Sequence, residues 1–274
     1  MERPTVQDIF LRFYPKYLDK YTPSPQQSKV ANCIINCKTG AYGANISICE
    51  DCGHPQIHYN SCRNRCCPMC QALPKELWMD KRREDVLEAP YFHVVFTVPQ
   101  ELNPLIYCNQ QLLYDVLYHS VSATINELTE DTNHLGAQSV INYLGKYTHR
   151  IAISNHRIIR MDEDNVTYFV KDYREEGKWK ECTISGIEFI RRFLMHVLPK
   201  RFVRIRHYGL LCTRTKTRHL TLCRNLLGCK QYLSKLKDME TPQILETLYG
   251  IKVTVCKCCG GHLGKPQQRT PLRI

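Results

Sequence analysis

The sequence predicts an α+β protein whose N-terminal part is a cysteine-rich, metal-binding module. Three observations support this class: paired Cys-x-x-Cys motifs, short aromatic and β-branched runs typical of strands, and longer amphipathic segments typical of helices. The 274 residues, 43% of them apolar, are enough for two or three small domains with their own cores. We expect an N-terminal helix and metal module over 1–89, a central domain over 90–237 and a C-terminal tail over 238–274.

The N-terminal elements follow from spacing and from helix breakers. Residues 6–21 carry apolar side chains at helical spacing, and Pro23 and Pro25 end this pattern. The cysteine-rich stretch 33–70 is expected to be rich in loops. Residues 71–89 then predict a helix with a charged face.

The central segments include both helical spacing of apolar residues and short runs typical of strands. A helix is predicted over 185–199, where Ser185 is the candidate N-cap and Glu188 completes a capping box. A long amphipathic helix is predicted over 103–130. Strands are predicted over 91–99 ("YFHVVFTVP"), 150–155 ("RIAISN") and 165–173 ("NVTYFVKDY").

Two Cys-x-x-Cys pairs, Cys49/Cys52 and Cys67/Cys70, are separated by fourteen residues. Each such turn aims two thiolates at one point, so the two pairs predict one tetrahedral zinc site in a zinc-ribbon-like module. The zinc is expected to be structural, because four thiolates leave no open position for catalysis. Further candidate ligands are Cys37, His54, His58, Cys62 and Cys66, and with them a second zinc site is an open alternative.

The C-terminal pair Cys256/Cys259 is a weaker signal, because one pair supplies only half a site. Disulfides are not expected, since the chain begins without the apolar core of a signal peptide. The longest apolar runs are too short to span a bilayer. We therefore expect a cytoplasmic protein with no membrane partner.

Positive charge is concentrated in one segment. The net charge is +12, and between Glu188 and Asp238 there are thirteen Lys and Arg residues and no acid. An ordinary solvated face mixes both signs, so this basic segment (residues 191–237) predicts binding to the phosphate backbone of nucleic acid. The candidate DNA-binding residues are Arg63, Arg65, Arg150, Arg191, Arg192, Lys200, Arg201, Arg204 and Arg206.

The segment "NYLGKYTHR" places Tyr143 and Tyr147 four residues apart, with Lys146 between them. On a helix both phenols would lie on one face. This spacing alone favours core packing over chemistry.

Five motifs in order carry a family resemblance: "CRNRCCPMCQ", "YFHVVFTVP" followed by "ELNPL", "YLGKYTHRIAISNHRI", "KDYR" and "EFIRRFLMHVLPKRFVRIRHYGLL". They resemble the two-tyrosine rolling-circle transposases of insertion sequences, of the HUH class, with an N-terminal zinc-binding domain. The resemblance implies an antiparallel-sheet catalytic domain, single-stranded or element-end DNA as substrate, and Mg²⁺ or Mn²⁺. Tyr143 and Tyr147 match the nucleophile pair that forms a 5′-phosphotyrosine, and Lys146 matches the basic residue between them.

The chain departs from this family at the ligands of the catalytic metal. The family uses a His–hydrophobic–His pair upstream of the tyrosines, but no two of the eleven histidines here lie two apart. Residues 134–138 run almost directly into the tyrosine segment, so we expect an internal deletion and a shortened catalytic-type domain. The missing strand would leave an open sheet edge, which predicts self-association.

The sequence thus predicts an insertion-sequence transposase with impaired strand cleavage. One alternative is a non-catalytic, zinc-dependent DNA-binding remnant or regulator of transposition. A zinc-ribbon RNA-binding protein is a third interpretation, but it leaves the tyrosine segment unexplained.

Overall fold

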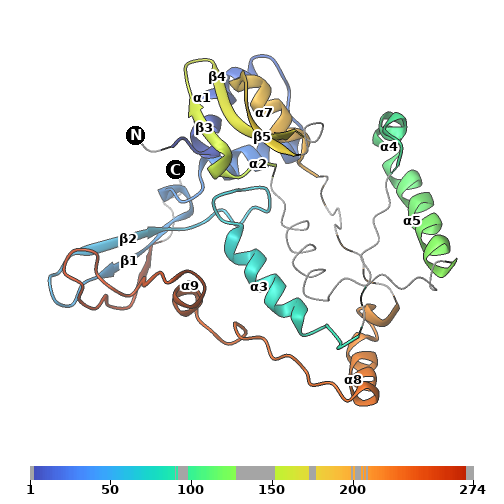
Figure 1. Ribbon diagram of the computed structural model, residues 1–274. Helices are drawn as coiled ribbons and strands as arrows, with labels where there is room; N and C mark the ends of the chain where they lie inside the picture. Colours follow the sequence, from blue (N-terminus) through green and yellow to red (C-terminus); the bar gives the residue numbers. More distant parts are fainter. Residues whose placement is uncertain are drawn as a thin grey trace.

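The computed structural model describes residues 3–89, 91, 98–127, 152–172, 177–198, 200, 205, 207 and 209–269 (Figure 1). Within these residues no helix has the length and apolar character needed to cross a bilayer. The helices are α1 (Val6–Leu18), α2 (Pro25–Ile35), α3 (Ala72–Arg83), α4 (Asn103–Cys108), α5 (Gln110–Glu127), α7 (Gly186–Met195), α8 (Lys216–Leu227) and α9 (Thr241–Tyr249). The strands are β1 (Ala44–Ile48), β2 (Pro55–Tyr59), β3 (Ile158–Met161), β4 (Asn165–Asp172), β5 (Lys178–Ser185) and β6 (Gln267–Arg269).

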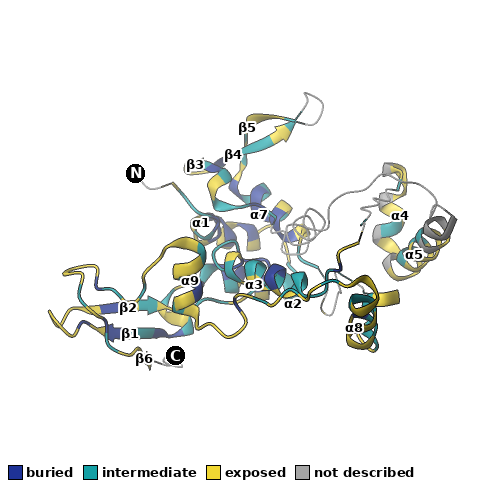
Figure 2. Cartoon of the chain, turned by 60° about the horizontal axis from the view of Figure 1, so that its bottom comes forward, coloured by how far each residue is buried: buried dark blue, intermediate teal, exposed yellow. Residues whose placement is uncertain are grey.

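The main core lies where α1, α2 and α7 pack beside the antiparallel sheet β3–β4–β5. The apolar residues of α1 recur at helical spacing and are buried along one side of the helix. Among them is Phe10, whose ring packs edge-on against that of Phe193 on α7, with the ring centroids 5.1 Å apart. Ile158 of β3 and Val166 of β4 are fully buried from the sheet side. Figure 2 shows dark-blue, buried stretches in α1 and α7, whereas β5 is teal and yellow. The N-terminal module and the central strands therefore share one core.

The second sheet joins the N-terminal module to the last described residues of the chain. Strand β1 pairs antiparallel with β2, from Ala44 opposite Tyr59 to Ile48 opposite Pro55. On its other edge β1 pairs with β6, where Ala44 lies opposite Arg269. Residues 267–269 of the segment expected as a C-terminal tail therefore form an edge strand of the sheet that contains β1 and β2.

The α+β class is confirmed, and several predicted elements have the expected type. The helix over 71–89 is observed as α3, the strand over 165–173 as β4 and the helix over 185–199 as α7. The helix predicted over 103–130 is instead two helices, α4 and α5, that meet at Asn109. Residues 92–97 of the strand predicted over 91–99 lie outside the described residues, so its edge and the expected self-association stay predictions.

Two local expectations were wrong. The described residues of the strand predicted over 150–155 do not pair; a short 3₁₀ turn at Asn155–Arg157 precedes β3, and there the Asn155 side chain accepts a hydrogen bond from the Val6 N–H at 3.0 Å. The capping box of α7 is only half formed. Ser185 accepts from the Glu188 N–H, but the Glu188 carboxylate turns to two arginines instead.

Candidate metal centres and nucleic-acid surfaces

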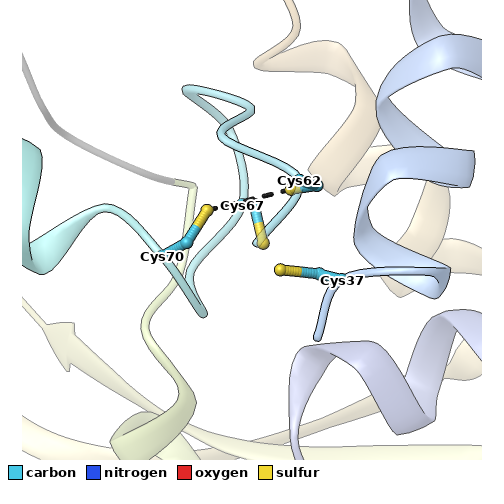
Figure 3. Close-up of side chains that lie close together, drawn as sticks. All are labelled: Cys37, Cys62, Cys67 and Cys70. Atoms are coloured by element: carbon cyan, nitrogen blue, oxygen red, sulfur yellow. Dashed lines mark hydrogen bonds between the residues drawn. The ribbon is translucent and has the colours of Figure 1, made fainter. Parts of the chain in front are cut away.

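Four cysteines from two segments meet at the edge of the main core, and we call them the inner cluster: Cys37, Cys62, Cys67 and Cys70. Their sulfur atoms all lie within 4.8 Å of one another, and the Cys62 and Cys70 sulfurs are 3.8 Å apart. Figure 3 shows the four side chains pointing toward a common centre. Cys37 follows α2, and the other three come from the loop that leads into α3.

Backbone turns place the inner cysteines. The Cys37 N–H donates to the Ile34 carbonyl as α2 ends, and the Gln7 side chain donates to the Cys37 carbonyl at 2.9 Å. In the loop, the Asn64 N–H donates to the Cys62 sulfur at 3.4 Å. The Asn64 carbonyl accepts from the Cys67 N–H at 3.0 Å, which closes the turn. These hydrogen bonds fix the backbone that carries Cys37, Cys62 and Cys67.

A second group of four, the outer cluster, combines two cysteines of the N-terminal module with two near the C-terminus: Cys49, Cys52, Cys256 and Cys259. Its sulfur atoms also lie within 4.8 Å of one another. Two of the contacts cross between the segments: Cys49 to Cys259 at 3.5 Å and Cys52 to Cys256 at 3.8 Å. Cys49 and Cys256 are buried, whereas Cys52 and Cys259 are exposed.

Both clusters fit a tetrahedral zinc ion. With zinc–sulfur bonds of about 2.3 Å, tetrahedral geometry places neighbouring sulfurs about 3.8 Å apart, close to the observed separations. All sixteen cysteines are free of disulfides. Contacts with the thiols of Cys62 and Cys67 lower the pKa of Cys70 to about 3, and the contact with Cys62 raises that of Cys67. Four thiols this close cannot all ionise without a cation, so the arrangement favours a bound metal.

The single zinc site expected from the two N-terminal pairs was therefore wrong in its grouping. The structure separates Cys49 and Cys52 from Cys67 and Cys70, because β1 and β2 carry the first pair away from the core. Cys62 does join a cluster, but Cys66 is buried in the main core outside both groups. The pair expected to be half a site, Cys256/Cys259, supplies half of the outer cluster.

The predicted catalytic residues Tyr143, Lys146 and Tyr147 lie outside the described residues. So do four predicted DNA-binding arginines: Arg150, Arg201, Arg204 and Arg206. Among the described ones, Arg63 and Lys200 are exposed, and Arg65 is partly buried.

Arg191 and Arg192 share one carboxylate. Their Nε atoms donate to Glu188 at 2.6 Å and 2.7 Å. These hydrogen bonds, first from Arg191 and then from Arg192, lower the pKa of Glu188 to about 2. The two arginines are therefore partly neutralised within α7, which leaves them less charge for a phosphate than the sequence suggested.

The structure also reveals a surface that the sequence analysis missed. Trp179 on β5 is 54% exposed and lies directly opposite Lys171 on β4. The Lys171 Nζ and the Arg157 Cζ each lie 5.3 Å from the centre of its ring. An exposed aromatic ring flanked by cations is the arrangement on which single-stranded bases stack.

Comparisons with known proteins give matches along most of the chain. A family model described as a transposase zinc-binding domain matches residues 9–98, and one described as a putative transposase matches residues 116–219. The putative transposase y4qJ of Sinorhizobium fredii is 30% identical over 377 residues, covering 96% of this chain and 94% of that protein. The transposase for insertion sequence element IS801 of Pseudomonas savastanoi pv. phaseolicola is 31% identical over 87 residues, 31% of this chain and 21% of that protein. No solved structure matches.

The alignment with the Sinorhizobium fredii protein is longer than the chain itself. It spans 377 positions against 274 residues, which leaves at least 103 positions with no residue of this chain. The chain is therefore shorter than this relative inside the aligned region.

Proposed function

Because this chain belongs to the insertion-sequence transposases that join a zinc-binding domain to a rolling-circle transposase domain, we propose that it binds the DNA of its element but cleaves it poorly. The proposal rests on one observation: the chain keeps both domains of the family but is internally shorter than its relative. Both domains of the family are recognisable, yet the aligned relative has at least 103 positions that this chain lacks (377 against 274).

The chemistry of strand cleavage explains why a shortened chain would lose cleavage activity and still bind DNA. A tyrosine phenol has a pKa of about 10, so it must be deprotonated before it attacks a phosphate. In this proposal Tyr143 and Tyr147 are the nucleophiles, and the charge of Lys146 favours the phenolate. The second need is to neutralise the phosphate, and here the family's ligand pattern has no counterpart among the histidines. Losing that neutralisation costs several kcal/mol, which is about a thousandfold or more in rate.

Binding depends on other features that this chain retains. The basic segment supplies phosphate contacts, and the Trp179 surface supplies stacking beside Lys171 and Arg157. Single-stranded DNA suits both kinds of contact, because its bases are free to stack. This favours an element end in single-stranded form as the ligand.

Trp179 provides the test of binding. Replacing it by alanine should weaken binding of a single-stranded element end by about 1–3 kcal/mol, because one base loses its stacking partner. Trp179→Phe keeps an aromatic face and should retain most of the affinity. Fluorescence anisotropy at fixed salt measures both variants. Equal affinities for wild type and Trp179→Ala would remove this surface from the proposal.

Cleavage is tested by a covalent product. The purified chain is incubated with single-stranded DNA carrying an element end, plus magnesium or manganese, and denatured. We expect no protein–DNA adduct above background, although the same DNA is bound. An adduct that disappears in Tyr143→Phe or Tyr147→Phe would contradict the proposed impairment and establish an active transposase. Intact binding with no adduct favours the non-catalytic remnant or regulator.

A further inference from the structure

We propose that the outer cluster is a second zinc site, which fastens the C-terminal segment to the N-terminal zinc module. Neither Cys256 nor Cys259 lies within the segment that resembles known zinc-binding domains, residues 9–98. The module would then be assembled from two stretches of chain more than 200 residues apart, since Cys52 and Cys256 are separated by 204 positions.

The strongest support is that the two cysteine pairs form the same backbone turn. In each, a glycine follows the second cysteine with positive φ: 68° at Gly53 and 77° at Gly260. The glycine N–H then donates to the carbonyl of the first cysteine, at 3.0 Å for Cys49 and 2.9 Å for Cys256. This φ favours glycine. Two copies of one thiolate-presenting turn, facing each other, form the two halves of a zinc ribbon's metal site.

Each turn closes with a second matching hydrogen bond. The Cys49 N–H donates to the His54 carbonyl at 3.0 Å, and the Cys256 N–H donates to the Gly261 carbonyl at 2.8 Å. In the second turn, the Cys258 N–H also donates to the Cys256 sulfur at 3.4 Å. The backbone thus stabilises a thiolate at the point where the ligand is needed.

Hydrogen bonds between the turns fix their relative position. The Glu50 N–H donates to the His262 carbonyl at 3.0 Å, and the Gly264 N–H donates to the Ile48 carbonyl at 2.9 Å. The Asp51 carboxylate accepts from the His262 N–H at 3.2 Å. These contacts hold the two turns face to face with their sulfurs converging.

The apolar contacts at this junction are too few to hold it alone. Among the described residues, its buried cluster consists of Cys49, Cys256 and Leu263, and two of these three are the proposed ligands. Strand β6 adds three residues of pairing with β1. A contact this small is only marginally stable without a cross-link. A metal ion bound by four thiolates is one of the usual ways to stabilise such a contact.

The two zinc ions should differ in how readily they leave. The inner cluster adjoins the main core, where Cys37 and Cys67 are completely buried. In the outer cluster, Cys52 and Cys259 are exposed. A chelator should therefore remove the outer ion first.

The first experiment counts zinc. Native mass spectrometry of the full chain, purified with zinc, should find two ions. Cys256→Ser combined with Cys259→Ser should retain one. Cys258→Ser is the matched control, because Cys258 is an exposed thiol between the two ligands but outside the cluster, and it should retain two. A wild type with one zinc, or a double variant with two, would overturn the proposal.

The second experiment uses the wild-type chain, so it does not depend on a variant folding. Zinc is withdrawn in steps with a chelator, and a maleimide labels the thiols that become free. After release of the first ion, peptide mapping should find label gained at Cys49, Cys52, Cys256 and Cys259, with the inner four still protected. Label divided between the two clusters at this stage would refute the proposed grouping. Neither experiment depends on DNA binding or cleavage.

Discussion

Gly186 starts α7 directly against the ring of Phe13 on α1, and its missing side chain is what permits this approach. A Cβ built at Gly186 would lie 2.3 Å from the Phe13 Cγ, and Phe13 is itself buried. Gly186→Ala should therefore destabilise the fold by about 1–3 kcal/mol through overpacking. Gly40→Ala is the control, because a Cβ there meets nothing within 4 Å. Denaturant unfolding of both variants measures the difference, and equal stabilities would contradict the role given to this contact.

Single residues also show how far the sequence could locate the metal sites. Cys-x-x-Cys spacing correctly identified the thiolate-presenting turns, but spacing along the chain does not say which turns meet in space. A finer signal was present: glycine follows the second cysteine at Gly53 and Gly260, whereas Gln71 follows Cys70. The first two turns have matching backbone geometry, and they are the pair that meets.

At the scale of elements, α7 depends on its N-terminal cap. The Ser185 hydroxyl accepts from the Glu188 N–H at 3.3 Å and so satisfies one free donor of the first turn. Ser185→Ala should lower the free energy of unfolding by about 1 kcal/mol. Thr215→Ala is matched to it, since Thr215 is the N-cap of α8 but its side chain makes no capping bond. Thermal unfolding should show a clear loss for Ser185→Ala alone; a similar loss in both would mean that the cap contributes nothing specific.

The sequence predicted best those elements in which the regularly spaced apolar residues are also the residues buried in the structure. Strand β4 and helix α7 bury the apolar residues that marked them, including Val166 and Ile190. Strand β5 was missed because its pattern is obscured by lysines and by an exposed tryptophan, Trp179. Helix α8 was missed because only Leu220 is buried within it, so its sequence shows little amphipathic pattern.

At the scale of the whole molecule, the basic segment should give DNA binding a strong dependence on salt. Each neutralised phosphate releases counterions, so the logarithm of affinity should fall linearly with the logarithm of salt concentration. Replacing Arg204 and Arg206 together by glutamine should reduce this slope by about 1 for each phosphate that the variant no longer neutralises. Titrations of DNA binding between low and physiological salt measure the slope. An unchanged slope would exclude these two residues from binding the phosphates.

Arg191 and Arg192 provide the internal comparison for that experiment. Both donate to Glu188, whose lowered pKa, about 2, keeps it charged at any pH used for DNA binding. The same double replacement at these positions should therefore change the slope less than at Arg204 and Arg206. An equal or larger change would mean that the two arginines exchange their carboxylate for phosphate when DNA binds.

The whole-molecule arrangement was the part least accessible from sequence. The three expected segments had sensible boundaries by composition, but the main core and the β1–β6 pairing both cross them. Long-range pairing of a three-residue strand such as β6 leaves almost no local signal, because its position is set by partners far away in the chain.

The joining of β1 to β6 and of Cys49 to Cys259 also dictates an order of events during translation. Cys52 leaves the ribosome 204 residues before Cys256, which at about 5–20 residues per second is a delay of about 10 to 40 s. Throughout this interval the first cysteine pair lacks its native partners, while Cys67 and Cys70 are already nearby in sequence. The nascent chain thus passes through a period in which the wrong four thiolates can share one metal. A chain truncated before Cys256 should reveal this trapped species as a zinc-bound form in which Cys49 and Cys52 resist alkylation, and free Cys49 and Cys52 in that chain would rule it out.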